Sequence, residues 1–451
     1  MGVRLGFASL LAAGVALPAM AQTSPVAIPP KDFGPVWTGF YVGAAFGAGG
    51  MVNNLSTGGG GLASTVNGAG GSGVLGSIYG GVDYQVLPRA VIGVLGELTL
   101  ASISGTSSAT VPGANASVTS QPNFGWALLA RAGFLANSST LFYFTGGYTG
   151  QNIRTSGTAT AGGAWASFSR TDTFNGWTFG PGFEAMLGRN WATKLEYRYS
   201  QYGAQTISGV TMSPSTHTVR AGLTYKFGGF GMAPPESTPT FNEPAFNWTG
   251  IYGGVAAGAG MATGPVTASA GGASATFDGA GQGLMAGVFI GADYQFARQG
   301  VVGVMGDFTW SGMQSTATIT APGGGAYAAV SPNRSWSIMG RLGYLPIPST
   351  LLYAAAGYSN MNVKASGTAM LGGAALFGER DTAVSGWTVG PGIETVISGG
   401  WTTRLEYRYS QYEQKQVAWG VTTQPSTHTV RLGLAYKFGI GADNKSLAAA
   451  D

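Results

Sequence analysis

A strictly alternating segment closes each half of the sequence and limits what the chain can fold into. Residues 216–227 read Thr-His-Thr-Val-Arg-Ala-Gly-Leu-Thr-Tyr-Lys-Phe, and residues 427–438 repeat them with two changes. Thr216, Arg220 and Lys226 fall on one parity, whereas Val219 and Phe227 fall on the opposite, mostly apolar parity. A period of two that ends in aromatic residues is typical of a transmembrane β-barrel strand.

Motifs throughout the sequence return about 210 residues later, which indicates a tandem duplication. Trp37-Thr-Gly-Phe-Tyr matches Trp248-Thr-Gly-Ile-Tyr, and residues 195–202 are identical to residues 405–412. We therefore predict one β-barrel repeat over residues 37–228 and a second over residues 248–439.

The N-terminus and the composition indicate a bacterial outer-membrane protein. Arg4, the apolar run 5–17 and Ala19-Met20-Ala21 predict a cleaved secretory signal peptide over residues 1–21. Only 9% of the residues are charged, 12% are aromatic, and no later apolar run reaches the ~20 residues that a spanning helix needs. The remaining segments are expected to be a periplasmic lead (22–36), a proline-containing linker (229–247) and a C-terminal tail (440–451).

Each repeat contains about eight strand-like segments, joined alternately by short and long connections. The short connections of the first repeat are predicted to be periplasmic turns: residues 87–89, 137–139 and 188–190. The long connections are rich in Gly, Ser and Thr and are predicted to be extracellular loops: residues 49–73, 102–123, 151–175 and 203–215. Aromatic residues near the strand ends predict girdles at the two membrane surfaces, with Trp37, Trp191, Tyr225 and Phe227 on the periplasmic side and Trp126 and Trp177 on the outer side.

Strand parity assigns the ionisable residues to the face opposite the apolar one, because a charge facing lipid at mid-membrane costs about 2–4 kcal/mol. The predicted interior set of the first repeat is Asp83, Glu97, Glu184 and Glu196 with Arg131, Lys194, Arg198 and Arg220. The set of the second repeat is Asp293, Asp307, Glu394 and Glu406 with Arg341, Arg404, Arg408 and Arg431. An eight-stranded barrel has room inside for side chains rather than a wide channel, so we expect a paired, charge-balanced plug.

The duplication allows either two closed eight-stranded barrels or one sixteen-stranded barrel with an aqueous channel. Each repeat has its own charge-balanced interior set. The stretch between the repeats, with Pro234, Pro235, Pro239 and Pro244, is longer than the other predicted periplasmic turns. Both observations favour two barrels.

Enzymatic, metal and nucleic-acid sites find little support in the sequence. Residues 68–73 match a dinucleotide-binding fingerprint by letters but lack a βαβ context. His217 and His428 lie on the outward parity with Ser215 and Ser426 nearby, but no acid shares that face to complete a catalytic triad. No cluster of metal ligands is present, and a net charge of +4 is too small for a nucleic-acid footprint. We predict no enzyme, no cofactor and no nucleic-acid partner, and leave haem binding open.

Three motifs carry a resemblance to a known family: the opening Trp-Thr-Gly-Phe-Tyr, the Leu-Glu-Tyr-Arg-Tyr at residue 195, and the closing alternating segment. The chain resembles the small alphaproteobacterial outer-membrane β-barrel family of 25- and 31-kilodalton surface antigens, in tandem duplication. The closing strands also resemble the terminal-strand signal read by the outer-membrane assembly machinery, carried here by Gly222, Tyr225 and Phe227 and by Gly433, Tyr436 and Phe438. The chain departs from the family pattern by its doubling and by the twelve residues after its last strand.

The resemblance implies structural surface proteins, some of them porin-like and some haem-binding. We predict a structural outer-membrane protein that supports envelope integrity and surface display. The alternatives are passive transport of small solutes and the binding of haem or a host ligand through the long loops. Its predicted partners are outer-membrane lipid, lipopolysaccharide and the assembly machinery, and its oligomeric state stays open.

Overall fold

The computed structural model describes residues 37–188, 190–207, 209–227, 246–270, 272–371, 374–418 and 420–439. The predicted signal peptide, periplasmic lead and C-terminal tail, and the linker up to residue 245, lie outside these ranges. Their boundaries therefore stay predictions. No helix within the described ranges is long and apolar enough to cross a membrane.

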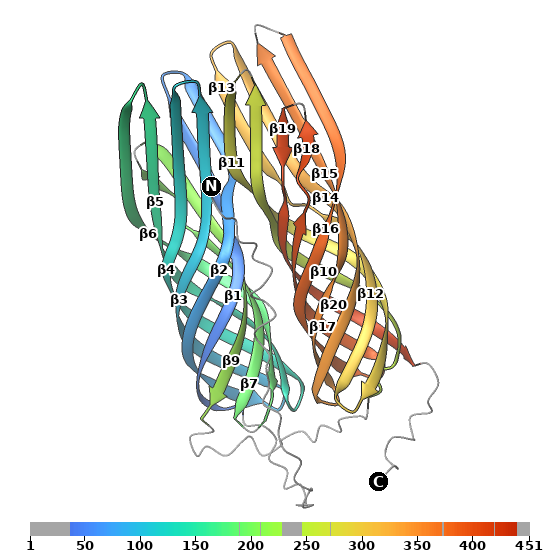
Figure 1. Ribbon diagram of the computed structural model, residues 1–451. Coiled ribbons are helices and arrows are strands. Elements are labelled where there is room, and N and C mark those ends of the chain that lie inside the picture. The colour runs from blue at the N-terminus through green and yellow to red at the C-terminus, as the bar shows by residue number, and fades with distance from the viewer. Residues whose placement is uncertain are drawn as a thin grey trace, which may run out of the picture. The chain divides into compact units, whose positions relative to one another are not determined.

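The first repeat is a closed antiparallel barrel (Figure 1). Its strands are β1 (Gly39–Gly59), β2 (Leu62–Leu87), β3 (Ala90–Val111), β4 (Ala114–Asn137), β5 (Thr140–Ala161), β6 (Ala164–Met186), β7 (Trp191–Tyr202), the short β8 (Gln205–Ile207) and β9 (Val210–Lys226). Each strand from β1 to β6 pairs with the next, β7 pairs with β9, and β9 pairs with β1. These pairings close a ring of eight strands, with β8 as a small addition to β9.

The second repeat closes a ring of its own by the same order of pairings. Its strands are β10 (Gly250–Ala270), β11 (Ala273–Ala297), β12 (Gly300–Ser311), β13 (Ser315–Ala321), β14 (Gly324–Ile347), β15 (Thr350–Leu371), β16 (Ala374–Ser398), β17 (Trp401–Tyr412), β18 (Lys415–Ala418), β19 (Val421–Thr423) and β20 (Ser426–Gly439). The closing strand β20 pairs with β10 over Ser426–Gly439, as β9 does with β1. The prediction of two barrels rather than one is confirmed.

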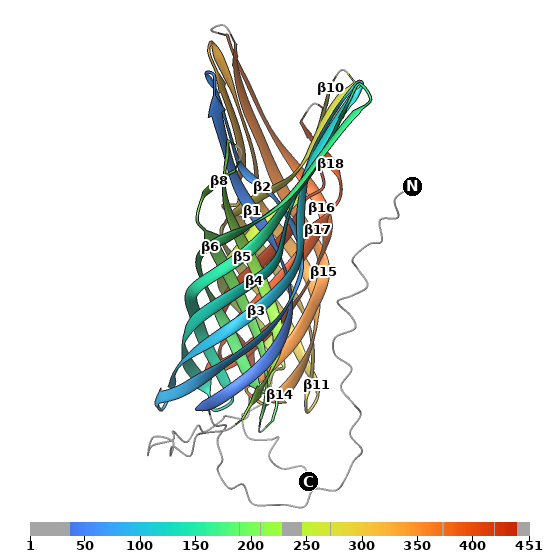
Figure 2. The same cartoon turned by 90° about the vertical axis from the view of Figure 1, so that its left-hand side faces the viewer.

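The prediction of long extracellular loops is wrong for most of their length. The segments at 49–73, 102–123 and 151–175 are mainly paired strand, and each reverses in a tight turn (Figures 1 and 2). Gly61, Gly113 and Gly163 occupy these turns with φ of 84°, 80° and 84°, a backbone conformation that side chains disfavour. A composition of Gly, Ser, Thr and Ala resembles a loop, but any residue except proline can pair its backbone on both sides of a ladder.

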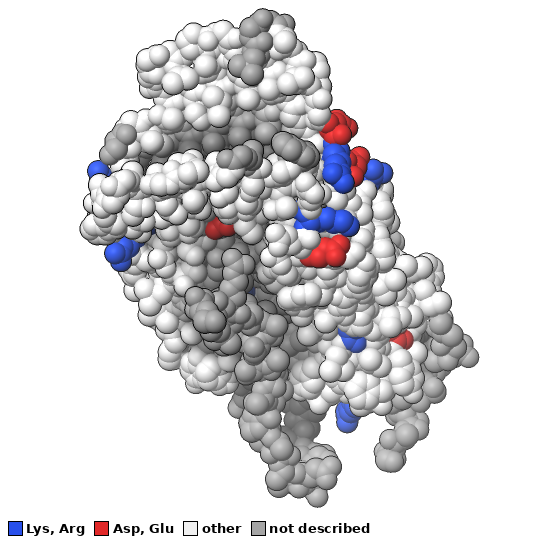
Figure 3. Space-filling view, turned by 45° about the horizontal axis from the view of Figure 1, so that its top comes forward, with Lys and Arg blue, Asp and Glu red and all other residues white. Residues whose placement is uncertain are grey.

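The outward and inward faces of the strands differ as the alternation predicts. On β4, Leu128 is 63% exposed and its neighbour Leu129 only 1%. Figure 3 shows a surface with few charged residues, gathered in small groups. An exposed ion pair joins Lys364 of β15 and Glu379 of β16, whose Nζ and Oε1 atoms are 2.8 Å apart. An apolar, mostly uncharged exterior is what a lipid-facing barrel requires.

Candidate functional site

The half of the first barrel nearest the short turns, which is predicted to be periplasmic, holds a cluster of four buried charges from β2, β4, β6 and β9, here called the periplasmic cluster. The Arg131 guanidinium lies 2.6 Å from Glu184 Oε2 and 3.5 Å from Asp83 Oδ2. The Lys226 ammonium lies 2.9 Å from Glu184 Oε1 and 3.4 Å from Asp83 Oδ2. Arg131 also stacks on the Tyr143 ring at 4.0 Å. Two acids therefore face two bases in a fully desolvated space, and an aromatic ring covers one base.

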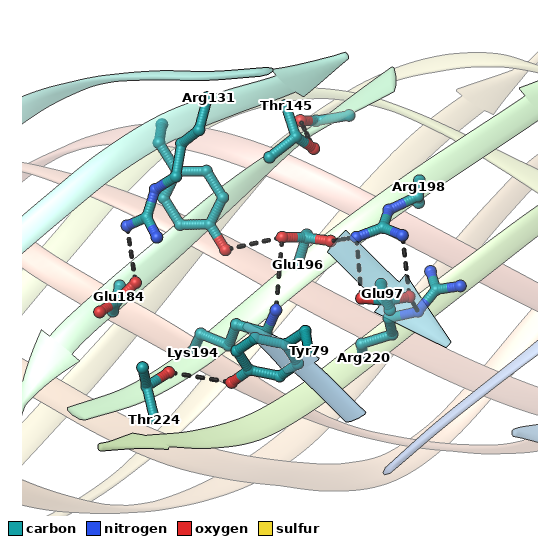
Figure 4. Close-up of polar contacts among 12 residues, drawn as sticks. Tyr79, Glu97, Arg131, Thr145, Glu184, Lys194, Glu196, Arg198, Arg220 and Thr224 are labelled. Carbon is teal, nitrogen blue, oxygen red and sulfur yellow. Dashed lines mark hydrogen bonds and ion pairs between the residues drawn. The ribbon is translucent and has the colours of Figure 1, made fainter. Parts of the chain in front are cut away.

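A second cluster, here called the outer cluster, lies farther from the short turns and contains Glu97, Lys194, Glu196, Arg198 and Arg220 (Figure 4). Arg198 donates to both Glu97, at 2.9 Å from Oε1, and Glu196. Arg220 Nε lies 3.2 Å from Glu97 Oε1, and Lys194 Nζ lies 3.7 Å from Glu196 Oε2. The Tyr143 hydroxyl donates to Glu196 at 2.9 Å. Tyr143 therefore connects the two clusters, since its ring contacts Arg131 and its hydroxyl contacts Glu196.

The second barrel repeats both clusters with its own residues. In the periplasmic cluster Arg341 pairs with Asp293 and with Glu394, at 2.7 Å from the latter, and Lys437 pairs with Asp293 at 2.5 Å. In the outer cluster Arg408 pairs with Asp307, at 2.5 Å, and with Glu406. Arg431 joins it at 2.7 Å from Asp307.

One equivalent position shows how the two interiors have diverged together. In the first barrel the Lys194 ammonium lies 3.5 Å from the centre of the Tyr79 ring. In the second barrel the Arg404 guanidinium lies 3.5 Å from the centre of the Phe289 ring. Both pairs place a cation over an aromatic face, although both residues differ between the repeats.

The structure places fourteen of the sixteen predicted interior charges among the buried residues, and Asp307 and Arg431 are partly buried. Lys226 and Lys437 were not among the predicted interior charges, although both share the parity of Arg220 and Arg431. With them, each interior holds four acids and five bases, so the predicted charge balance is wrong by one positive charge per barrel. The excess lies in the outer cluster, since the periplasmic cluster is balanced.

Trp37 was predicted in the lipid-facing girdle, and this is wrong. Its side chain is buried in an apolar cluster with Leu141, Tyr143 and Met186, and its Nε1 donates to the Ser138 carbonyl at 3.0 Å. The Lys226 ammonium lies 4.6 Å from its ring. The residue precedes β1, so strand parity does not govern its direction. The other predicted girdle aromatics are exposed or partly buried, and Trp191 packs edge-on against Tyr225 at 5.1 Å.

Close packing against the central tyrosine depends on a glycine. A Cβ atom added at Gly182 would lie 2.3 Å from the Tyr143 ring, and one at the equivalent Gly392 would lie 2.2 Å from Tyr353. We expect Gly182→Ala to cost about 1–3 kcal/mol of unfolding free energy, because it displaces the ring that Arg131 and Glu196 contact. Urea unfolding in detergent measures this effect. Gly96→Ala is the matched control, since a Cβ there meets no atom within 4 Å. Equal losses in the two variants would contradict the packing argument.

The histidines lie on the outward face as predicted, but they are buried rather than exposed at the membrane surface. Tyr197 Oη and His217 Nδ1 are 2.7 Å apart, and Tyr407 Oη and His428 Nδ1 are 2.8 Å apart. No carboxylate hydrogen-bonds to either imidazole among the contacts of the described residues, and the same residues contain no cluster of three metal-ligand side chains. The fingerprint-like residues 68–73 lie within strand β2.

Comparison with known proteins identifies the family. The sequence model of one family, described as "Outer membrane protein beta-barrel domain", matches residues 7–227 and again residues 249–438. The chain belongs to this family. As an outer-membrane β-barrel protein it is located in the bacterial outer membrane, and its family is non-enzymatic.

Relatives of this outer-membrane β-barrel protein match about one repeat of it. The 31 kDa outer-membrane immunogenic protein of Brucella melitensis is 29% identical over 205 residues, or 43% of this chain and 85% of that protein. The 22 kDa outer membrane protein of Rhizobium leguminosarum bv. viciae is 31% identical over 201 residues, or 44% of this chain and 81% of that protein. The resemblance stated from the sequence is confirmed.

Two solved structures show similarity at low sequence identity. Ail, the attachment invasion locus protein of Yersinia pestis, is 15% identical with a TM-score of 0.23, covering 42% of this chain and 99% of that one. The toluene transporter TodX of Pseudomonas putida is 12% identical with a TM-score of 0.28, covering 89% of this chain and 91% of that one.

Proposed function

We propose that the protein is a structural component of the outer membrane that supports envelope integrity and displays β-hairpins at the cell surface. The observation that carries this proposal is the filling of both interiors with ion pairs and aromatic rings. All eight interior acids are paired with bases, so a passing solute would find no free carboxylate, and opening the lumen would leave buried charges unpaired. The geometry therefore favours a closed barrel over a solute channel.

Surface display is supported by the length of the strands. Strands β2, β4 and β6 run for 26, 24 and 23 residues, whereas a tilted membrane strand needs about 9–11. The outward aromatics Trp126 and Trp177 pack against Tyr148 and Tyr199, and these four residues form the outer girdle of the first barrel. The hairpin residues beyond this girdle, such as 151–175, extend outside the membrane. Relatives named immunogenic proteins also support exposure.

Envelope integrity is tested in a strain that lacks the gene. We expect increased uptake of a hydrophobic fluorescent dye and increased sensitivity to detergent, both restored by the full-length protein. Uptake of a small hydrophilic solute should not change. A fall in hydrophilic uptake with normal dye exclusion would contradict the structural role and support transport.

Display is tested with an epitope inserted at two turns of the same barrel. An epitope between Gly162 and Gly163 should bind antibody on intact cells, because that turn lies at the far end of the β5–β6 hairpin. An epitope between Pro88 and Arg89, at the predicted periplasmic turn, should bind antibody only after permeabilisation. Labelling of the second insertion on intact cells would reverse the proposed orientation.

A second candidate, ligand binding at the surface, is favoured by exposed apolar side chains on the hairpins. Trp165 is 69% exposed near the turn between β5 and β6, and Phe377 is 81% exposed on β16. Exposed apolar groups at such positions often mark an interaction site. Titration with haem, followed by its absorbance, tests one such ligand, and the variant Trp165→Ser with Phe168→Ser should abolish any binding at this hairpin.

Two partner assignments belong to the same proposal. The closing strands carry Gly222, Tyr225 and Phe227 in one barrel and Gly433, Tyr436 and Phe438 in the other, and we propose that the assembly machinery reads each of them. Lipopolysaccharide is the proposed partner above the outer aromatic girdle, where the strand extensions leave the membrane.

A further inference from the structure

One stretch of the outward face of each barrel is buried instead of facing lipid. Phe183, Leu195, Tyr197 and Val219 have the outward parity, yet they are 0%, 3%, 7% and 6% exposed. The residues that cover them are Ile393, Leu405, Tyr407 and Val430, in one continuous apolar cluster. These are the equivalent positions of the second repeat. The same patch on both barrels therefore packs against itself, as in an isologous two-fold interface.

A polar contact at the periplasmic end follows the same symmetry. Thr140 and Thr350 occupy equivalent positions, each following the short turn that opens β5 or β15, and their Oγ1 atoms are 2.9 Å apart. Toward the tips of the long hairpins the contact continues as strand pairing. Ser274–Phe277 of β11 pair with Ser107–Thr110 of β3, and Thr316–Thr320 of β13 pair with Ala63–Asn67 of β2.

The symmetry fails at a few positions, and at each of them the two repeats complement each other. Gly50 and Met261 are equivalent, since both pair with the closing-strand histidine of their own barrel. The Met261 Cε atom lies only 2.5 Å from where a Cβ at Gly50 would be. The methionine of one barrel therefore fills a notch that the glycine of the other leaves open.

The residues paired with this position in the adjacent strand differ as well. Ser72 pairs with Gly50, and Gln282 pairs with Met261. Gln282 Oε1 crosses to the other repeat and lies 2.7 Å from His217 Nε2 and 3.0 Å from Ser215 Oγ. His428 receives no such partner, and its Nε2 has no hydrogen bond within the described part of the chain.

The periplasmic turn shows a third exchange. Asn137 pairs with Thr140, and its equivalent Ile347 pairs with Thr350. Thr140 also pairs with Ala185, whereas Thr350 pairs with Thr395. The amide of Asn137 donates to Thr395 Oγ1 at 2.9 Å across the interface. Both residues of this hydrogen bond are replaced by apolar residues in the other repeat, since Ile347 is the equivalent of Asn137 and Ala185 is the equivalent of Thr395.

We infer that the two barrels are built to pair with each other inside the membrane, and that the exchanged residues favour repeat 1 with repeat 2 over either repeat with itself. In a bilayer, two apolar protein surfaces gain little free energy by leaving the lipid tails, because the tails are equally apolar. Close packing and polar contacts therefore decide which surfaces associate. Two copies of repeat 2 would bring Met261 against Met261, and two copies of repeat 1 would leave the space beside Gly50 empty. The duplicated gene thus encodes a pair of complementary subunits in one chain.

Proximity of the barrels is tested by cross-linking, for which the absence of cysteine is an advantage. The variant carries Thr140→Cys with Thr350→Cys and a protease site inserted between residues 227 and 246. After mild oxidation in outer membranes and cleavage, the two halves should migrate together on a non-reducing gel and separate on reduction. Leu128→Cys with Ile338→Cys is the control, because these equivalent side chains are 63% and 61% exposed and should give separate halves. Separate halves from both pairs would overturn the interface.

The exchanged residues are tested in the cleaved full-length protein, with folding of both barrels checked by heat-modifiable migration. Met261→Gly and Gln282→Ser give repeat 2 the residues of repeat 1. We expect each to speed separation of the halves in detergent by about tenfold, since a cavity or an unpaired imidazole is left. Val255→Gly on β10 and Leu284→Ser on β11 are the lipid-facing controls and should leave separation unchanged. Equal effects of interface and control variants would show that the interface has no preference for these residues.

Discussion

Replacement of Arg131 by methionine is expected to lower the unfolding free energy of the first barrel by about 3–5 kcal/mol. The substitution preserves much of the side-chain volume but leaves Asp83 and Glu184 to share the single ammonium of Lys226. It also removes the cation from the face of the Tyr143 ring. Two like charges at a buried site repel each other, and a buried charge that loses its partner is costly.

Urea titration in detergent, followed by heat-modifiable migration, measures this loss. Arg170→Met is the matched control, because the Arg170–Asp172 pair has an arginine side chain that is 59% exposed and exposed pairs contribute about 0–1 kcal/mol. Adding Asp83→Asn and Glu184→Gln to Arg131→Met should recover part of the loss, since the unpaired charges are then gone. If Arg131→Met and Arg170→Met are equally stable, the interior cluster does not hold the barrel together.

Arginine in place of Val94 is expected to cost about 2–4 kcal/mol of membrane-inserted stability. Val94 is exposed on the outward face of β3 and pairs with Ala130, which lies on β4 midway between Trp126 and Phe134. A guanidinium at this depth would have to reach the membrane surface along the barrel wall or thin the bilayer around it.

Leu87→Arg is the control for depth, because Leu87 is similarly exposed but lies at the short turn into β3. A charge near the membrane surface costs only about 0–1 kcal/mol, so this variant should fold into liposomes nearly as well as the parent protein. Equal folding yields for Val94→Arg and Leu87→Arg would mean that this face of β3 does not contact the centre of the bilayer.

The sequence predicted the strands and their faces because both depend on local alternation. Leu128 and Leu129 illustrate this, since identical residues one position apart have opposite environments that parity alone assigns. The extracellular segments were predicted wrongly because their composition resembles that of loops, whereas the pairing of residues 49–59 with 62–73 depends on backbone groups that every residue carries.

The interior charges could be predicted for the same reason, but their grouping could not. Parity gives the face on which a side chain lies but not its position along the barrel axis. The division into two clusters depends on the register between paired strands, which the sequence does not give. Parity also assigns Lys226 to the interior face, but it was not predicted among the interior charges because it lies beside the terminal aromatic residues. The contact surface between the repeats could not be predicted from the sequence, because Tyr197 and His217 point outward and no local sequence pattern shows that a second barrel covers them.

Planar-bilayer conductance of the purified full-length protein tests most directly the claim that both barrels are closed and filled. With the Arg131 and Arg341 clusters intact, we expect no steady channel in symmetric salt at moderate voltage. Large, stable conductance steps would contradict this account, and the contradiction would be complete if the steps changed in size or ion selectivity on replacement of Glu184 or Arg198, since those charges would then line an open path.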